Sequence, residues 1–343
     1  MKPSMGIFGL GSMGCLIAQA LIDSGYEITI AVDSDPGKAG RDLGALIGRE
    51  NRGVRVSESL DQTGRECDLF VHSTCSRLRD AFPQVSCILE SGCNVISTCE
   101  ELSYPYLRNR ELSKRLDSTA EDNGVTILGT GVNPGFLLDA LPVFLTATCT
   151  RVDSVRASRT VEASLRREPL QRKVGLGMDP DDFRTKTDRG EMGHIGLFES
   201  CALIASALGL ELSEMRQDIS PVIADEEVQT GFFSISPGQV RGLRQDLEGT
   251  AGEVLIRMDL EMSVGAKNPG DSVRIEGDPP VDLHIRNGLH GDRATVGRVL
   301  SSIEGVILST EGLITVLDLP PSPRGAREQL FEKTSLTGTG RLL

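Results

Sequence analysis

The chain has 343 residues, which is enough for about two domains with a large buried core. Its formal net charge of −13 argues against a nucleic acid or an anionic membrane as a partner and is compatible with a cationic small substrate. No apolar run is long enough to span a membrane, and the N-terminus lacks the pattern of a signal peptide. The eight cysteines and four histidines show no metal-ligand spacing, which predicts reduced thiols, no metal site and a cytoplasmic protein.

The N-terminal segment has the pattern of a dinucleotide-binding β-α-β unit. An apolar strand over 5–8 is followed by G-x-G-x-x-G, by a helical pattern that stops at Gly25, and by a second strand over 27–32. The glycines allow a tight turn and let a pyrophosphate approach the N-terminus of the helix. A glycine turn that binds no ligand is the competing interpretation. The loop residues predicted to contact a cofactor are Gly9, Gly11, Ser12, Met13 and Gly14.

Asp33 follows the second strand, at the position where an acid accepts hydrogen bonds from the adenosine ribose of a dinucleotide. Its negative charge would repel a 2′-phosphate, so the sequence favours NAD over NADP. Lys38 and Arg41 are close enough in sequence to keep the use of NADP open.

The alternation of buried strands and helical patterns continues to residue 135. It predicts a parallel sheet with right-handed crossovers, which is a Rossmann-type α/β domain over residues 1–135. The expected strands lie at 67–74, 94–99 and within 125–135, and the expected helices end near Leu89 and cover 108–123. Ligands of such sheets bind beyond the carboxyl ends of the strands. The segments expected to converge there are 72–74, 97–101 and 129–135.

After residue 135 the apolar spacing changes to a period of two. This pattern predicts a second α+β domain over 136–291 with a mixed, largely antiparallel sheet, for substrate binding and dimerisation. Its expected strands are 151–163, 252–264, 271–278 and 281–288, and a helix is expected over 195–210. We expect a homodimer, because the apolar faces of this sheet need a partner.

Three further segments complete the predicted organisation. Residues 164–192 form a polar, charged connection, which we interpret as an irregular lid or binding loop, with a disordered segment as the alternative. Residues 292–320 contain a helix and a short strand that should return to the first domain, and 321–343 is expected to be a flexible tail.

Glu100 and Glu101 follow the strand that ends near Ser97, and two interpretations of this acidic pair remain. The pair could begin a helix, where acidic side chains suit the dipole of the first turn. Alternatively, a carboxylate at this edge would face the reacting carbon beside a nicotinamide, where it would stabilise an amine or an iminium. It could also act as a general base toward ammonium or an attacking water. This chemistry favours oxidation of a C–N bond over a C–O bond.

Four further motifs are STCEELSYPY, GTGVNPGFLLDALP, RREPLQRKVG and GHIGLFESCALIA. They resemble those of the 2,4-diaminopentanoate dehydrogenase group of NAD(P)-dependent amine dehydrogenases, which share the architecture of dihydrodipicolinate reductase. The resemblance extends from about residue 5 to about residue 320. It implies oxidative deamination of the C4 amine of 2,4-diaminopentanoate to 2-amino-4-oxopentanoate, with ammonia and NAD(P)H released. The reverse reaction is the reductive amination of a ketone.

The resemblance also implies roles for individual residues. The catalytic carboxylate matches Glu101, with Glu100 as the alternative. Asn133 and Gly135 would lie beside the nicotinamide, and Ser73, Thr74 and Thr98 along the cofactor. The residues matched to the substrate side are Arg166, Arg167, Gln171, Lys173, His194 and Tyr104. For the basic segment a solvated loop is the alternative, for His194 a helix start, and for Tyr104 packing of the turn.

Two other functions compete with an amine dehydrogenase. One is a reductase of C=N or C=C bonds like dihydrodipicolinate reductase, but the His-and-Lys signature expected for it is absent around His194. The other is a dinucleotide-binding protein without catalytic activity, which would bind the cofactor and turn over no amine.

Overall fold

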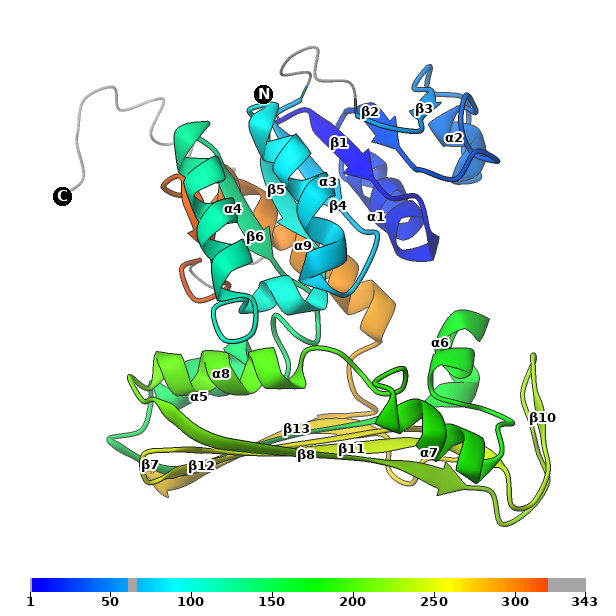
Figure 1. Cartoon of the computed structure of the whole chain (residues 1–343), viewed down its shortest axis with the longest axis vertical. Helices are drawn as coiled ribbons and strands as arrows, with labels where there is room; N and C mark the ends of the chain where they lie inside the picture. Colours follow the sequence, from blue (N-terminus) through cyan, green and yellow to red (C-terminus); the bar gives the residue numbers. More distant parts are fainter. Residues whose placement is uncertain (1, 61–66, 320–343) are drawn as a thin grey trace. The chain divides into compact units, whose positions relative to one another are not determined.

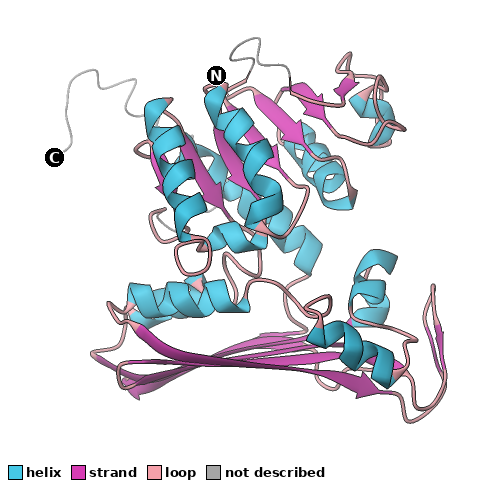
Figure 2. Cartoon of the chain, viewed as in Figure 1, coloured by secondary structure: helices cyan, strands magenta, loops and turns pink. Residues whose placement is uncertain are grey.

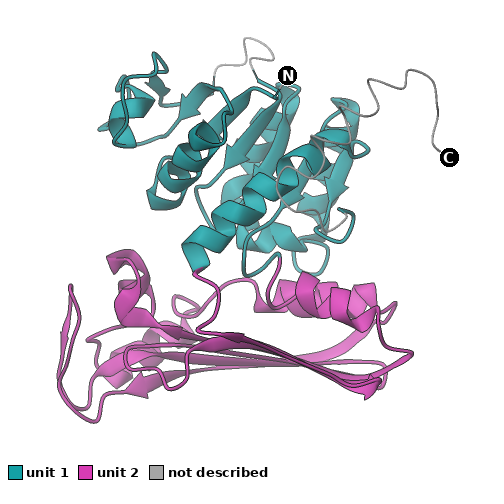
Figure 3. Ribbon diagram, turned by 180° about the vertical axis from the view of Figure 1, so that it is seen from behind, with its two compact units in different colours: residues 1–135, 291–343 teal, residues 136–290 magenta. Residues whose placement is uncertain are grey.

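The computed structural model describes residues 2–60 and 67–319, so the predicted tail at 321–343 lies outside the described residues. The chain divides into two units (Figure 3). Unit 1 contains residues 1–135 and the segment from Gly291 onward, and unit 2 contains Phe136–His290. Within the described residues, none of the helices has both the length and the apolar character needed to cross a membrane.

Unit 1 is built on a sheet of seven strands in the order β15-β6-β5-β4-β1-β2-β3. All neighbouring strands pair in parallel, which confirms the predicted Rossmann-type sheet and the return of the C-terminal strand to it (Figures 1 and 2). The strands are β1 (Met5–Phe8), β2 (Ile28–Val32), β3 (Val56–Ser57), β4 (Leu69–His72), β5 (Asn94–Ser97), β6 (Thr126–Gly129) and β15 (Gly312–Ile314).

Helices cover both faces of this sheet, which explains why its strands are continuous apolar runs in the sequence. On one face, the core packs α3 and α4 against β4, β5 and β6 around fully buried side chains such as Phe70, Leu89 and Ile127. On the other, α9 packs against β4, β5 and β6 and against α1. The helices of unit 1 are α1 (Ser12–Asp23), α2 (Leu43–Leu46), α3 (Leu78–Glu90), α4 (Arg110–Asp122) and α9 (Gly291–Leu308), with the 3-10 helix η1 (Glu100–Ser103).

Unit 2 contains a six-stranded sheet in the order β14-β13-β7-β12-β11-β8. Only the β7–β12 pair is parallel, so the predicted mixed, largely antiparallel sheet is confirmed. Its strands are β7 (Arg151–Glu162), β8 (Leu212–Ile223), β11 (Val240–Ala251), β12 (Val254–Ser263), β13 (Gly270–Asp278) and β14 (Val281–Arg286). The other elements are α5 (Ala140–Thr146), η2 (Ala163–Leu165), α6 (Glu168–Lys173), α7 (Pro180–Asp188), α8 (Leu197–Ala207) and the hairpin of β9 (Val228–Gln229) and β10 (Ser234–Ile235).

The prediction of an irregular connection over 164–192 is wrong, because this segment contains α6 and α7. Each helix has a proline in its first turn, where the missing N–H has no cost. The Asp179 side chain also caps α7 by accepting a hydrogen bond from the N–H of Asp181 at 2.9 Å. Such short, highly charged helices are specified by their ends, and apolar periodicity does not reveal them.

The two faces of the unit 2 sheet differ in chemistry. Leu247, Met258 and Val155 belong to the buried face. Charged side chains alternate with them on the outer face and pair across the strands, as in Arg156–Asp259 at 2.6 Å, Arg244–Glu261 at 2.8 Å and Arg257–Glu248 at 2.8 Å. In the described strands this face is therefore polar, and the expectation that two apolar faces need a partner is wrong. The homodimer itself stays a prediction.

A buried ion pair holds the end of unit 2. Arg159 and Asp271 are each 3% exposed and lie 3.4 Å apart. Arg159 donates to the carbonyl of Leu289 at 2.6 Å, and Asp271 accepts from the N–H of the same residue at 2.6 Å. Burial lowers the pKa of Arg159 and raises the pKa of Asp271, since it disfavours both charged forms. The pair therefore fixes the backbone just before the chain leaves unit 2.

We predict that Asp271→Ala lowers the free energy of unfolding by about 3–5 kcal/mol, because it leaves the Arg159 charge buried and uncompensated. Urea unfolding would measure this loss. Asp153→Ala is the matched control, since the Arg151–Asp153 pair is exposed and should contribute little to stability. Equal losses in the two variants would contradict a structural role for the buried pair.

Candidate active site

Backbone hydrogen bonds connect the residues that follow four neighbouring strands at the carboxyl edge of the unit 1 sheet. The N–H of Ser73 donates to the carbonyl of Phe8 at 2.8 Å, the N–H of Thr98 to His72 at 3.0 Å, and the N–H of Thr130 to Ser97 at 2.9 Å. The hydroxyl of Thr98 also donates to the hydroxyl of Ser73 at 3.3 Å. The structure thus brings the ends of β1, β4, β5 and β6 together, as the three polar segments of the sequence predicted.

The glycine loop after β1 fits the close approach of a phosphate. A Cβ atom on Gly14 would lie 1.8 Å from the carbonyl oxygen of Gly9, so only glycine lets α1 pack against the strand end. A Cβ on Gly9 would lie 2.4 Å from the carbonyl oxygen of Ser73. At Gly11, by contrast, no atom of the described residues lies within 4 Å of the position that a Cβ would take, and this residue precedes the N-terminus of α1. This is the geometry in which backbone N–H groups can bind a pyrophosphate; Ser12 and Met13 begin the helix.

Asp33 connects the end of β2 to the glycine loop. Its carboxylate accepts hydrogen bonds from the N–H of Leu10 at 2.7 Å and from the ammonium of Lys38 at 2.9 Å. Burial opposes ionisation, but the hydrogen bonds from Asp35, Lys38 and Leu10 outweigh it and lower the pKa of Asp33. The acid is therefore ionised at neutral pH, with a lysine beside it. Lys38 also lies 3.5 Å from Asp35.

His72, at the end of β4, was not singled out from the sequence as a site residue. Its Nδ1 lies 2.9 Å from the Ser97 hydroxyl, and its Nε2 lies 2.8 Å from Gln84 Oε1 of α3 and 2.9 Å from the Thr74 hydroxyl. Burial lowers the pKa of His72 to about 4, with the hydrogen bond to Gln84 opposing the shift, so the ring is neutral at neutral pH. A polar residue ending an apolar strand was the available signal. The imidazole positions the strand ends and carries no charge there.

The loop after β6 contains the two residues matched to the nicotinamide side, Asn133 and Gly135. Gly135 has a φ of +112°, and a Cβ there would lie 2.5 Å from the N atom of Gly131, so the loop closes tightly on itself. The N–H of Val132 donates to the hydroxyl of Thr295 on α9 at 3.2 Å. Helix α9 therefore fixes the loop at the edge of the unit 1 sheet.

The two glutamates of η1 have different environments. Glu101 is 6% exposed, and its Oε2 accepts hydrogen bonds from the N–H of Leu78 at 2.8 Å and from the Asn109 amide at 3.2 Å. Its carboxylate thus caps the N-terminus of α3, where the helix dipole favours a negative charge. Glu100 is half-buried. Burial raises the pKa of the Cys99 thiol, and the charge of the neighbouring Glu100 adds to this shift.

Tyr104 packs in the turn that follows η1. Its ring lies edge-on to Tyr106, with centroids 5.3 Å apart, and the Tyr106 hydroxyl donates to the carbonyl of Leu313 in β15 at 3.0 Å. Burial raises the pKa of Tyr106 to about 12, so this hydroxyl keeps its proton. These contacts stabilise the turn that carries the glutamates.

The other residues matched to the substrate side belong to unit 2. Gln171 is fully buried: it donates to the carbonyls of Arg166 at 2.8 Å and Ser164 at 3.2 Å, and accepts from the Thr230 hydroxyl at 2.9 Å. Its amide therefore holds α6 in place. Arg166 and Arg167 are half-buried just before this helix, whereas Lys173 at its end is exposed. The backbone of His194 is held from both sides by the Gln245 side chain, at 2.6 and 3.0 Å.

Within residues 2–60 and 67–319 no three His, Cys, Asp or Glu side chains are grouped to hold a metal ion. The glycine loop, the acid after β2 and the polar strand ends are instead typical of dinucleotide-dependent dehydrogenases. The 2,4-diaminopentanoate dehydrogenase of Acetoanaerobium sticklandii is 31% identical over 331 residues, covering 92% of each chain. The family model for the C-terminal domain of 2,4-diaminopentanoate dehydrogenase matches residues 136–333. The chain therefore belongs to the 2,4-diaminopentanoate dehydrogenase family, which confirms the resemblance of its motifs.

Two further proteins are similar over nearly the whole chain. An amine dehydrogenase of Streptomyces virginiae is 25% identical, covering 92% of this chain and 96% of its own. The solved structure of an amine dehydrogenase from Mycobacterium smegmatis aligns with a TM-score of 0.84 at 25% identity, covering 94% of this chain and 97% of that one. The similarity therefore includes both units.

We predict that Glu101→Ala lowers the free energy of unfolding by about 0.5–2 kcal/mol, because the N–H of Leu78 loses the acceptor that caps α3. Urea unfolding would measure the loss. Glu111→Ala provides a control, since that glutamate is 82% exposed and makes only a surface pair with Lys114. A Glu101 variant as stable as the control would show that the cap is dispensable.

Proposed function

We propose that the protein is an NAD(P)-dependent amine dehydrogenase that oxidatively deaminates 2,4-diaminopentanoate to 2-amino-4-oxopentanoate and ammonia, and that Glu100 is its catalytic carboxylate. The observation that carries the proposal is the difference between the two glutamates of η1. Glu101 is buried and caps α3, whereas Glu100 follows the same strand end and is only half-buried. The proposal therefore differs from the assignment to Glu101 made from the motif.

The residues at this edge have distinct roles in the proposed reaction. A nicotinamide bound at this edge would supply the acceptor for the hydride that leaves the amine-bearing carbon. The Glu100 carboxylate stabilises the iminium cation that remains and takes a proton from the water that attacks it. A C–O bond forms, and Glu100 passes the proton to the nitrogen. Glu100 then takes the proton of the new hydroxyl group as the C–N bond breaks, so that the carbonyl forms and the nitrogen leaves as ammonia. In the reverse direction Glu100 returns the proton.

The remaining cofactor contacts are proposed from their positions. The N–H groups at the start of α1, including those of Ser12 and Met13, would bind the pyrophosphate, and Asp33 the adenosine ribose. Ser73, Thr74, Thr98, Asn133 and Gly135 stay predicted contacts along the rest of the cofactor. A C=N or C=C reductase is not favoured, because relatives that cover nearly the whole chain are named as dehydrogenases of amines.

We predict that Glu100→Gln lowers kcat for 2,4-diaminopentanoate by about 10²–10⁴-fold, the range typical of a lost general base, while NAD still binds. NADH absorbance would follow turnover, and titration of protein fluorescence or calorimetry would follow cofactor binding. Because glutamine keeps the size of the side chain, the loss would report on the charge and the proton.

Two variants serve as controls for this prediction. Glu101→Gln should reduce turnover far less, and Glu111→Gln, on the exposed face of α4, should have no effect. If turnover is lost in Glu101→Gln and kept in Glu100→Gln, the proposed roles are reversed. If wild-type protein turns over neither 2,4-diaminopentanoate nor simple amines, and makes no amine from ketones, ammonium and NADH, the enzymatic function itself is wrong.

We propose NAD as the preferred cofactor, with NADP accepted through Lys38. Asp33 would repel a 2′-phosphate, but the ammonium of Lys38 lies 2.9 Å from its carboxylate and could pair with that phosphate instead. Asp33→Asn should therefore raise kcat/KM with NADP relative to NAD by about tenfold or more, which corresponds to 1.4 kcal/mol. Lys38→Met should lower the same ratio.

Asparagine is used at position 33 because its carbonyl oxygen can still accept the hydrogen bond from Leu10. Asp35→Asn is the control, since Asp35 is 53% exposed and lies farther from Lys38. Steady-state kinetics with both cofactors would measure the ratios. An equal loss with NAD and NADP in Asp33→Asn would contradict a role in choosing between them.

A further inference from the structure

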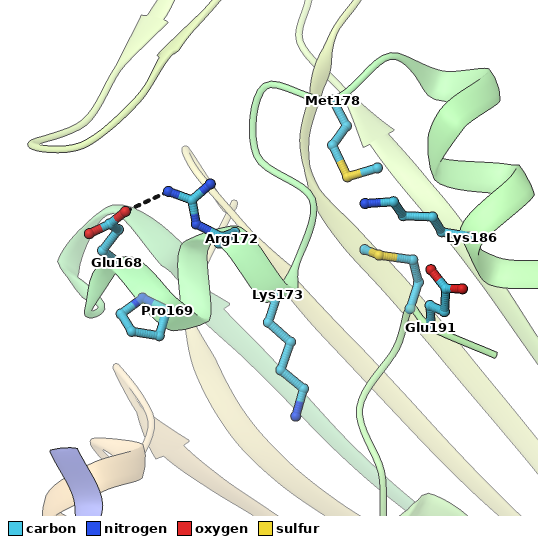
Figure 4. A pocket seen from close by; sticks show the side chains of 8 residues that line it. Glu168, Pro169, Arg172, Lys173, Met178, Lys186 and Glu191 are labelled. Carbon is cyan, nitrogen blue, oxygen red and sulfur yellow. Dashed lines mark hydrogen bonds and ion pairs between the residues drawn. The ribbon is translucent and has the colours of Figure 1, made fainter. Parts of the chain in front are cut away.

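Unit 2 contains a pocket of about 520 Å³, within the range of small-molecule sites. Figure 4 shows that it lies between α6, α7 and the segments on either side of α7. It is lined by Glu168, Pro169, Arg172, Lys173, Met178, Lys186, Glu191 and Met192. Of these, only Lys173 was singled out from the sequence.

The charged side chains of the pocket fall into two groups. Arg172 is already engaged, because its guanidinium lies 2.6 Å from the Glu168 carboxylate and 5.5 Å from the centre of the Phe233 ring. Among the described residues, by contrast, the ammonium groups of Lys173 and Lys186 and the carboxylate of Glu191 make no ion pair or hydrogen bond. The pocket therefore offers two cations and one anion for a ligand of mixed charge.

The walls that carry these groups are fixed by other contacts. The buried Gln171 amide holds α6 to the Thr230 hydroxyl of the β9–β10 hairpin at 2.9 Å. The carbonyl of Met178 accepts a hydrogen bond from the N–H of Val240 in β11 at 2.9 Å. At Gly175, a Cβ would lie 2.9 Å from the fully buried Phe183 ring of α7 and 3.2 Å from the Met192 methyl, so α7 and Met192 pack directly on this glycine. These contacts preorganise the walls of the pocket, which lowers the cost of ordering them when a ligand binds.

We propose that this pocket binds the 2-amino-carboxylate group of an amino acid. Lys186 would pair with the carboxylate and Glu191 with the ammonium, while Met178, Met192 and Pro169 contact the carbon chain. The proposal rests on the proposed function for its substrate class, since 2,4-diaminopentanoate carries this group at the end remote from its reacting amine. A phosphate is a poorer ligand, because Glu191 would repel it and offer it no donor.

The test measures binding apart from catalysis. 2-Aminopentanoate has the same amino-acid end but no amine at C4, so calorimetry with the full chain and no cofactor reports on the pocket alone. We expect wild-type protein to bind it, and Lys186→Met and Glu191→Gln each to weaken the affinity by tenfold or more. Lys267→Met, an exposed lysine of unit 2 outside the pocket, is the matched control and should bind as wild type. Absence of binding by wild type, or equal affinity in all four proteins, would overturn the proposal, as would binding of inorganic phosphate in preference to the amino acid.

Kinetics then show whether the ligand is the substrate itself or a second amino-acid molecule. They also separate a failure of the amino-acid site from a failure of the proposed function. If 2-aminopentanoate competes with 2,4-diaminopentanoate and Lys186→Met raises the ratio of KM for this substrate to KM for pentan-2-amine by tenfold or more, the pocket holds the substrate's own end. If it binds without competing, the ligand is a second amino-acid molecule; either result supports an amino-acid site. Binding without turnover of any amine would overturn the proposed function and leave the pocket intact. Turnover of an amine without binding of 2-aminopentanoate would support the proposed function and overturn the amino-acid site.

Discussion

The carboxylate of Glu101 must be hydrogen-bonded because it is buried at the junction of β5, η1 and α3, and the rest of the candidate site depends on how this need is met. Its bonds to Leu78 and Asn109 join the start of α3 to the segment before α4. They fix the direction in which η1 leaves the strand. Glu100 is thereby held beside the end of β5, because the hydrogen bonds of Glu101 fix the backbone that carries both side chains.

Each unit also fixes the backbone near the point where the chain leaves it. In unit 1 the hydroxyl of Thr295 holds the N–H of Val132, in the loop that precedes residue 136. In unit 2 the buried Arg159–Asp271 pair holds both backbone groups of Leu289, just before residue 291. The contacts are opposite in chemistry, a neutral hydroxyl and a buried ion pair. Both contacts give hydrogen-bond partners to backbone groups that lie between secondary-structure elements.

The sequence predicted the Rossmann-type sheet and the glycine loop because local rules govern them: strands buried on both faces are apolar runs, and only glycine at position 14 lets α1 pack against the loop after β1. It did not predict α6 and α7, whose prolines and caps matter more than their apolar spacing. The alternation of charged and apolar residues in the strands of unit 2 already indicates one polar face, so the expectation of two apolar faces went against the pattern of the sequence. The distinction between Glu100 and Glu101 arises from contacts with residues 23 and 8 positions away in the chain. No local pattern encodes them.

The charged side chains differ between the end of β5 in unit 1 and the α6–α7 pocket in unit 2, so the two places favour different chemical groups of a ligand. At the edge of unit 1, Asp33 is paired with Lys38 and Glu101 is buried on a helix N-terminus, so the negative charge that is half-exposed at the end of β5 is that of Glu100. A negative group there opposes the developing alkoxide of an alcohol and favours an iminium. In the α6–α7 pocket, cations outnumber acids, three to two. A cationic centre at the carbon to be oxidised suits the half-buried acid at the end of β5, and a zwitterionic amino-acid group suits the charges of the α6–α7 pocket.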